Sequence, residues 1–434
     1  MLKYLLPLLF LTACQRDDPG QSRTLTFWCS NNAGEITFAK EFTEQWQRTR
    51  PDKPLRYQPI PEGQSSEEII LASVVGKTTP DIYANMWQGS VEMYAKAKVL
   101  VPLDTLKGFR EFINARCDST VIREITASDG HIYQVPWKVN PFMLVCNTRA
   151  LSALKTGGPP YTYAGYTEAG RQFKQDNDGD GYVDQWLGYT EVKAIWYQRL
   201  FNFYPLYLAA SNGASLLTRT PDGRQKAAFN NRYAIEVFRF LQTLYRENYF
   251  AKERLSATRD PFLAKRIATQ FTGPWTVGFL EKYKDPGFAY GSFTMPVPDG
   301  HTGPVYSYGD PKNIVIFNTC RDPQAAWEFV RTLVDQPGDL RLLELTGQFP
   351  SRKNLDADPY FALFLSQHPR LQPFAKQTRF IKGVDNCEVI VEVFDIISQE
   401  YEACVIFNKK TPEAAVADAA KAVDVLLMSE RVRE

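Results

Sequence analysis

Alternation between short β-patterned runs and helical runs limits the fold of the N-terminal part of the chain more than any other feature. After the first β-patterned run, apolar residues keep helical spacing from Ile36 to Trp46, and two more strand-helix pairs follow. A β-α-β-α-β order places strands side by side in a parallel or mixed sheet with helices on its faces. The predicted strands cover 24–29, 55–60 and 81–85.

The rest of the chain is predicted to be richer in helices. A chain of 434 residues is too long for one ordinary core, so two or three domains are expected. Pro136 and Pro141 bound a segment between strand-like runs over 130–135 and 142–147, and this segment is the candidate crossover between two lobes. A further strand is predicted over 314–317, Gly347 stands where a helix would stop, and the tail from Val389 is mostly helical. Helices are predicted over 164–175, 196–210, 234–248, 324–334 and 340–345.

One strand-to-helix corner carries a candidate ligand contact. Residues 268–272 are strand-like, Gly273-Pro274 turns the chain, and Trp275 opens an apolar helix. Open α/β sheets bind ligands at such corners, near helix N-termini. We interpret Trp275 as a ligand-facing ring, with a position in the core as the alternative.

Charge and aromatic content narrow the class of partner. The 50 basic and 49 acidic residues give a net charge of +1, which does not indicate a nucleic-acid partner. The aromatic fraction of 13% includes 8 Trp and 22 Tyr. Aromatic faces with polar tips suit ligands that are apolar on one face and polar at their edges, as sugars are.

The first fourteen residues are predicted to be an export signal. Lys3 precedes an apolar run too short to span a bilayer, and the run ends in Leu-Thr-Ala-Cys at 11–14. This ending resembles the lipobox of bacterial lipoproteins, which implies that Cys14 becomes the lipidated first residue and anchors the chain to a membrane of the cell envelope. Residues 15–23 are polar and are interpreted as a tether.

Six further cysteines could form up to three disulfides in an exported protein. None lies in a Cys-x-x-Cys pair or beside a histidine. Cys29 and Cys146 lie in apolar strand-like runs, where free buried thiols are equally consistent with the sequence.

An Asp- and Gly-rich segment over 176–184 matches the start of a calcium loop. Carboxylates stand at loop positions 1, 3, 5 and 9, and the carbonyl of position 7 is a further candidate ligand. Position 12 is Leu187 instead of Glu, so a complete EF-hand is not expected. We predict a structural Ca²⁺, with a solvated turn as the alternative. The candidate ligands are Asp176, Asp178, Asp180, Tyr182 and Asp184.

Motifs for catalysis are not found. The three histidines do not form a recognisable triad pattern, and the chain has no P-loop, no Gly-x-Gly-x-x-Gly after a strand and no zinc signature. Pairs of carboxylates for glycoside hydrolysis can be drawn from the 49 acidic residues, but the sequence does not give their separation. The absence of these motifs weighs against an enzyme without excluding one, and no catalytic residue is assigned.

Several blocks in order give the chain a family resemblance. From about residue 24 to 352 it resembles the family 1 extracellular solute-binding proteins of ABC importers, the maltose and oligosaccharide group. The blocks are TPDIY at 79–83 followed by LVPLD at 100–104, DGHIYQVP at 129–136, FTGPW at 271–275, AAWEFV at 325–330, TG at 346–347 and PSR at 350–352. Lys-Thr-Thr at 77–79 departs from the family's usual Gly-Gly-Asp type of turn.

The resemblance implies a two-lobed α/β fold of the periplasmic-binding-protein type, with a mixed sheet in each lobe, crossover strands at a hinge and a helical C-terminal region. It places 24–137 and 287–336 in the first lobe, and 138–286 and 337–434 in the second. The ligand would be a sugar, most consistent with an oligosaccharide, held in the cleft of an exported monomer. Closure of the hinge on the ligand would present it to a membrane permease.

Ligand contacts are expected where strand ends and helix starts face this cleft. Trp275 carries over best from the family, and Arg352 matches the family's terminal Arg. Asp310 and Arg352 could instead form an ion pair. The full candidate set is Trp28, Asn31, Asn32, Glu62, Gln64, Asn85, Trp87, Trp137, Trp196, Tyr197, Trp275, Tyr308, Gly309, Asp310 and Arg352.

Three other functions remain open at this point. A surface lipoprotein glycoside hydrolase would need two carboxylates about 5 to 10 Å apart across the cleft. A calcium-dependent adhesin would show large exposed apolar patches instead of a deep cleft. An importer component for a non-sugar solute, such as a glycerol phosphodiester, would need several cations in the site, and the candidates include mainly Arg352.

Overall fold

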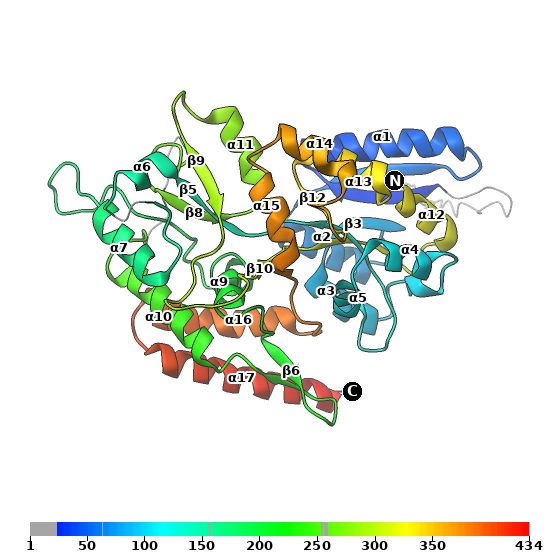
Figure 1. Cartoon of the computed structure of the whole chain (residues 1–434). Coiled ribbons are helices and arrows are strands. Elements are labelled where there is room, and N and C mark those ends of the chain that lie inside the picture. The colour runs from blue at the N-terminus through cyan, green and yellow to red at the C-terminus, as the bar shows by residue number, and fades with distance from the viewer. Residues whose placement is uncertain (1–23, 63, 156–157, 253–254, 256–258, 434) are drawn as a thin grey trace, which may run out of the picture.

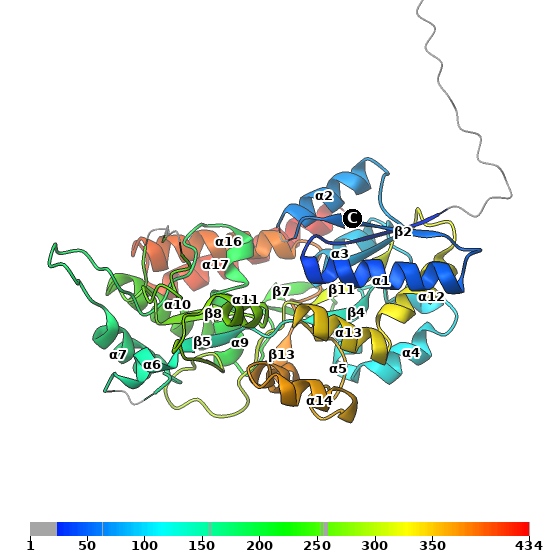
Figure 2. The same cartoon turned by 90° about the horizontal axis from the view of Figure 1, so that it is seen from above.

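The structure is a computed structural model that describes residues 24–62, 64–155, 158–252, 255 and 259–433. The predicted export signal, Cys14 and the tether lie outside these residues. Two lobes lie side by side, with the long helices of the C-terminal region packed along one of them (Figures 1 and 2). No helix in the described part of the chain is long and apolar enough to cross a membrane.

The first lobe is built on a six-stranded mixed sheet in the order β12-β4-β11-β3-β1-β2. β1 pairs in parallel with β2 and β3, while β11 runs antiparallel to β3 and β4. This confirms the predicted alternation, because a helix follows each of the first three strands. The strands are β1 (Leu25–Ser30), β2 (Leu55–Ile60), β3 (Ile82–Trp87), β4 (Val135–Val139), β11 (Lys312–Ile316) and β12 (Phe349–Pro350).

Helices cover this sheet with apolar stripes. On α1, Phe38, Phe42 and Trp46 recur every fourth residue and are buried, and they meet Trp137 and Phe329 in the first-lobe core. The helices of this lobe are α1 (Ala33–Thr49), α2 (Gln64–Val75), α3 (Gln88–Lys96), α4 (Phe109–Arg116), α5 (Ser119–Ile125), α12 (Pro323–Leu333) and α13 (Gln336–Thr346).

The second lobe contains a smaller sheet in the order β8-β5-β9. Both pairs in it are antiparallel, so the mixed sheet predicted for this lobe is not what these strands form. The reason is that β8 and β9 both run in the direction opposite to β5, which lies between them. The strands are β5 (Met143–Asn147), β8 (Thr269–Thr272) and β9 (Tyr290–Phe293).

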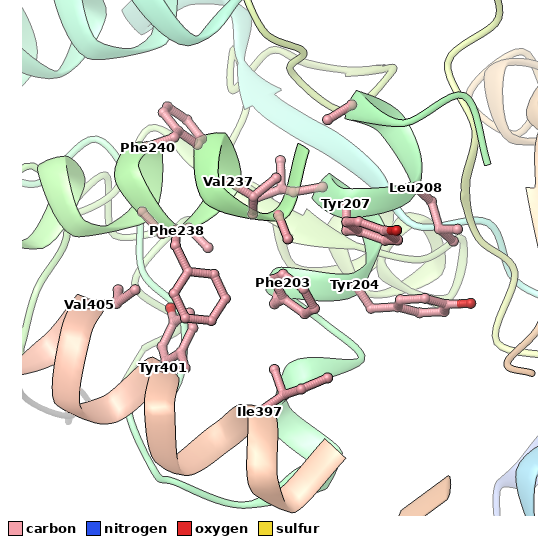
Figure 3. Packing of buried hydrophobic residues seen from close by; sticks show 14 of the residues in the cluster. Phe203, Tyr204, Tyr207, Leu208, Val237, Phe238, Phe240, Ile397, Tyr401 and Val405 are labelled. Atoms are coloured by element: carbon pink, nitrogen blue, oxygen red, sulfur yellow. The ribbon is translucent and has the colours of Figure 1, made fainter. Parts of the chain in front are cut away.

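Helices supply most of the second-lobe core. In Figure 3, Phe203 of α9 lies toward Phe238 of α10, which in turn lies beside Tyr401 of α16, with ring centroids 5.3 and 5.8 Å apart, and all three side chains are buried. The helices here are α6 (Thr148–Ser152), α7 (Tyr163–Phe173), α8 (Trp196–Arg199), α9 (Phe203–Ala210), α10 (Arg232–Arg246), α11 (Trp275–Tyr283), α14 (Pro359–Gln367), α15 (Gln372–Gln377), α16 (Ile390–Tyr401) and α17 (Pro412–Arg433). Two small sheets complete it, β6 (Leu217–Arg219) with β7 (Gln225–Ala227), and β10 (Ser307–Tyr308) with β13 (Ile381–Lys382).

The Pro-bounded segment does cross between the lobes, because β4 belongs to the six-stranded sheet and β5 to the smaller one, although most of the segment is itself the strand β4. Two local predictions were wrong: the run 130–134 is not a strand, and the helix predicted over 196–210 is divided into α8 and α9. The lobe boundaries also differ from the strand pairing. β9 lies in the stretch assigned to the first lobe but pairs with β5, and β12 lies in the stretch assigned to the second lobe but pairs with β4. Gly347 ends α13 in the left-handed conformation with φ 68°, as predicted.

The six cysteines of the described residues are all free and buried, so of the two possibilities left open by the sequence, disulfides or free thiols, the structure contains free thiols. Each thiol is packed in an apolar cluster, away from a bonding partner. Burial raises the pKa of Cys29 and of Cys404 to about 12, which keeps both thiols protonated.

Reduction should therefore leave the stability of the folded chain unchanged. We expect the melting temperature of the mature chain carrying Cys14→Ser to be the same with and without dithiothreitol, measured by circular dichroism. A disulfide is typically worth about 2 to 4 kcal/mol, so its reduction would lower the melting temperature by several degrees. A drop of that size would contradict the free-thiol assignment.

Candidate ligand-binding cleft

A cavity of about 430 Å³ lies between the lobes, within the usual size range of small-molecule sites. The first lobe lines it with the N-terminus of α1, the end of β3, the strands β4 and β11 and the end of α13. The second lobe contributes Tyr197, Phe201 and Trp275. One wall is therefore polar and charged and the other is aromatic.

A buried ion pair forms the base of the polar wall. The Lys138 ammonium on β4 donates to Glu35 Oε1 in the first turn of α1, and both side chains are almost fully buried. Glu35 also accepts from Asn32 Nδ2 at 2.9 Å, Asn85 Nδ2 at 3.1 Å and Gln348 Nε2 at 3.1 Å. Four donors on one carboxylate offset the cost of burying it.

A second ion pair lies beside the first. The register of β4 and β11 sets Lys138 directly opposite Lys312, and Lys312 pairs with Asp310 at 3.0 Å. Burial is the largest single effect and acts to lower the pKa of Lys312, but the charges of Asp310, Tyr197 and Glu67 and the hydrogen bond to Asp310 together outweigh it, so the pKa lies above its ordinary value. Each lysine thus has its own carboxylate.

Two residues of this wall have a strained backbone. Asn85 has φ 94° and Asp310 has φ 39°, both in the left-handed region that side chains seldom adopt. Asn85 lies within β3, at the point where the pairing of β3 with β11 shifts register. These conformations turn the Asn85 amide and the Asp310 carboxylate toward the cavity that both residues line.

Glu62 places a further carboxylate at the cavity. It accepts from the Ser30 hydroxyl and from Asn32 Nδ2 at 2.8 Å. Desolvation acts to raise the Glu62 pKa, but the charge of Lys138 and these two hydrogen bonds outweigh it, so the pKa lies below its ordinary value. Glu62 is therefore an ionised acceptor at neutral pH.

The aromatic wall is held by ring contacts. Trp275 is 42% exposed and its ring meets Phe142 edge-on at 5.5 Å between centroids. Phe142 stacks on Phe201 at 5.0 Å, and Tyr197 meets Phe201 at 4.6 Å. The indole of Trp275 is thus fixed at its edge, with surface left free at the cavity.

The structure brings six of the predicted site residues together around the cavity: Asn32, Glu62, Asn85, Tyr197, Trp275 and Asp310. Trp87 and Tyr308 are buried behind it, where Trp87 Nε1 donates to Tyr308 Oη at 2.9 Å, and Trp196 packs on Trp87 at 4.9 Å. These three residues support the site without lining it.

The other predicted residues do not line the cavity. Trp137 has no exposed surface and belongs to the first-lobe core, so its assignment as a ligand-facing ring was wrong. Arg352 pairs with Asp339 at 2.6 Å, which also excludes the suggested ion pair with Asp310. Gly309 packs against Ile381, Trp28 is half-buried against a smaller apolar cluster, and Asn31 is exposed. The Gln64 side chain lies outside the described part.

The sequence analysis missed Glu35, which is buried behind the polar wall as the partner of Lys138. It also missed polar and aromatic residues that line the cavity: Lys138, Asn140, Phe201, Lys312 and Gln348. Glu35 stands three residues after Asn32 and was available as a first-turn carboxylate. Lys138 lies inside the segment interpreted as a crossover. Neither had a visible partner in the sequence, because the two are 103 positions apart.

The predicted calcium loop folds into a compact exposed turn. Carboxylate oxygens of Asp176, Asp178 and Asp184 lie within 4.8 Å of one another, and the backbone N–H groups of Gly181 and Gly179 donate to Asp176 and lower its pKa. Asp180 is outside this group and accepts from the backbone N–H of Tyr182, two residues further along the chain. The Tyr182 side chain is exposed, and Leu187 at position 12 is buried and offers no ligand. The donor set fits Ca²⁺ in part, and calcium binding stays a prediction.

The chain matches a protein family and resembles solved structures. The family model for bacterial extracellular solute-binding proteins matches residues 38–364. A solved structure of an uncharacterised protein from Listeria monocytogenes EGD-e has 25% identity and a TM-score of 0.77, covering 93% of this chain and 99% of that one. No curated protein sequence gives a match.

Sugar-binding proteins are among the other similar structures. The sugar-binding protein MalE of Xanthomonas citri has 18% identity and a TM-score of 0.75, covering 94% of this chain and 98% of that one. The maltose/maltodextrin-binding domain of Bdellovibrio bacteriovorus, solved with maltotriose, has 18% identity and a TM-score of 0.69, covering 95% and 100%. At this identity the likeness shows the two-lobed α/β fold.

Removing one member of the buried ion pair should destabilise the chain. We expect Lys138→Met to lower the free energy of unfolding in urea by about 3 kcal/mol or more, because Glu35 is left buried and unpaired. Glu35→Gln combined with Lys138→Met should recover much of the loss. Lys40→Met is the matched control, since Lys40 and Glu44 form an exposed pair worth at most about 1 kcal/mol. Equal effects of Lys138→Met and Lys40→Met would contradict the role given to the buried pair.

The calcium prediction is tested by thermal unfolding. Millimolar CaCl₂ should raise the melting temperature of the wild type by about 1 to 3 °C if the site has the affinity usual for extracellular modules. Asp178→Asn with Asp184→Asn should abolish the shift. Asp222→Asn, in another exposed turn, is the control. An equal shift in all three proteins would show that the ion acts elsewhere.

Proposed function

Because the chain belongs to the bacterial extracellular solute-binding proteins, we propose that it binds an oligosaccharide in the cleft between its lobes and delivers it to an ABC importer. The matched family consists of binding proteins, so the chain is not classed as an enzyme. What remains open is the ligand, and the chemistry of the cleft supports a sugar.

The observation that carries the proposal is the exposed face of Trp275 opposite a wall of amides and carboxylates. A sugar ring is apolar on its C–H face and polar at its edge, so it can stack on an indole while its hydroxyls bind amides and carboxylates. Asn85 and Glu62 are within the same cavity, and Asn140 Oδ1 is buried there without a hydrogen-bond partner. A ligand hydroxyl would satisfy it.

The charges of the cleft argue against a phosphorylated solute. Its two lysines, Lys138 and Lys312, are already paired with Glu35 and Asp310, and Arg352 lies outside the cavity. A phosphodiester would need unpaired cations, and the described cavity residues offer none. The glycerol phosphodiester alternative is therefore less well supported than a neutral sugar.

The family places the chain outside the cytoplasm, and we propose that the lipid on Cys14 holds it there. Closure of the lobes around the sugar would then present the ligand to the transmembrane permease, with the chain acting as a monomer. The similar structures named for maltodextrin binding suggest maltodextrins as the first ligands to test.

Substitution of Trp275 tests the proposal directly. Isothermal titration calorimetry of the mature chain should detect binding of at least one series among maltodextrins, cello-oligosaccharides and xylo-oligosaccharides, with the sugar recovered uncleaved. Trp275→Ala should weaken that binding about tenfold or more, because a stacking face is lost.

Tyr360→Ala is the control for this experiment. Tyr360 has the same exposed fraction as Trp275, 42%, but lies on α14 outside the cavity, and its loss should leave the affinity unchanged. Absence of binding by every series, or hydrolysis of the sugar, would refute the proposed function.

A further inference from the structure

Helix α11 begins at the cavity with Trp275 and carries a row of exposed aromatic side chains along one face. Trp275, Phe279 and Tyr283 stand four residues apart and are 42%, 42% and 53% exposed. Residues four apart share a helix face, so the three rings cover about 12 Å of the helix axis. The rings of Phe279 and Tyr283 are 5.1 Å apart between centroids. We call these three residues the aromatic row.

The aromatic row begins in the cavity and continues outside it. Trp275 lines the cavity, whereas Phe279 and Tyr283 do not. In both views of the fold, α11 lies at the inner end of the second lobe (Figures 1 and 2). A ligand chain that leaves the cavity past Trp275 would therefore meet the next two rings in order.

The row is not needed to attach α11 to the lobe. α11 buries Thr276, Val277 and Leu280 against the lobe. Glu281 adds polar anchors, because it accepts from Tyr290 Oη at 2.7 Å and pairs with Lys284 at 2.8 Å. The helix is thus held by residues outside the row, and the exposed rings are free for a partner.

Gly278 follows Trp275 by three residues and borders the aromatic row on the Trp275 side. It is exposed, its backbone is helical, and an added Cβ would meet no atom within 4 Å. Glycine inside a helix costs about 1 kcal/mol relative to alanine. Neither packing nor backbone conformation requires glycine here, but its missing side chain leaves the helix surface beside Trp275 open.

We propose that the aromatic row extends the binding site beyond the cavity and takes successive sugar rings of an oligosaccharide too long for the cavity alone. This inference rests on the proposed function. Aromatic faces suit the C–H faces of sugars, and the open space at Gly278 lets a flat ring approach the helix. The ammonium of Lys282, 5.0 Å from the centre of the Tyr283 ring, can donate to a sugar hydroxyl.

Continuity with the cavity favours a sugar over a protein as the occupant. The exposed part of this face between 275 and 283 is aromatic, glycine and charged, with no exposed aliphatic side chain. An exposed aliphatic pair, such as Leu71 and Val75, is found instead on α2 in the first lobe.

The test compares affinity with chain length. Isothermal titration calorimetry is run with two to six units of each of the three oligosaccharide series, using wild type and Phe279→Ala with Tyr283→Ala. We expect unchanged affinity for the shortest bound sugar and about tenfold weaker binding of the longest. Tyr161→Ala with Tyr360→Ala is the matched control, because these rings have the same exposed fractions, 53% and 42%, on other segments.

A second variant separates ligand contact from helix stability. Gly278→Gln should raise the melting temperature by about 1 to 2 °C, because it removes a helix-interior glycine. It should nevertheless weaken binding of the longest sugar at least threefold, since its side chain fills the open space. A purely structural role for this face cannot produce these opposite changes.

Each outcome has one meaning. Equal affinity of the double variant and wild type for all lengths would overturn the inference and leave the row to another partner. Equal weakening at every length would also overturn it, by assigning the row to the folding or closure of the lobe. If the wild type bound sugars and the variants of the aromatic row bound every length as tightly as the Tyr161→Ala with Tyr360→Ala control, the proposed function would hold and this inference would fail. If the wild type bound no sugar, both would fail.

Discussion

The register between β4 and β11 is the constraint on which the cleft depends. It places Lys138 opposite Lys312 on one face of the sheet, and two ammonium groups in this position repel each other. Each lysine is paired with its own carboxylate, which offsets the repulsion. Glu35, in the first turn of α1, pairs with Lys138, and Asp310, two residues before β11, pairs with Lys312. The pairing thereby fixes where α1 begins relative to the sheet.

The remaining polar groups of the wall follow from this pairing. Asn32, Asn85 and Gln348 come from three elements and all donate to Glu35. Each amide is oriented by a buried carboxylate, so the wall is rigid before any ligand arrives. The aromatic wall is fixed by ring contacts in the same way. A preformed site of this kind loses little freedom when it binds.

Sequence patterns predicted the elements that depend on local order. The alternation of strands and helices in the first lobe, the start of α11 at Trp275 and the end of α13 at Gly347 all follow from periodicity and turn chemistry. β4 was missed because prolines usually end strands. Pro136 is tolerated there because it lies where the register of β4 against β11 shifts, a position at which strands accept proline.

The site was only half predictable for a related reason. Residues at strand ends and helix starts, such as Asn85 and Trp275, could be found because position alone suggested them. Lys138 could not, since its role comes from a carboxylate 103 residues away that tertiary packing brings to it. Trp137 shows the converse error. It precedes Lys138 on β4, yet it packs against Phe38 in the first-lobe core and has no surface left for a ligand.

The six buried thiols have a consequence for how the protein is made. Because the native chain contains them in reduced form, folding requires no oxidation step and no isomerase to sort partners. The same thiols are exposed in the unfolded chain, where any pair that oxidises forms a cross-link the native packing cannot contain. For an exported protein, folding therefore competes with oxidation of the exposed thiols. A chain that buries its core quickly leaves less time for non-native disulfides to form.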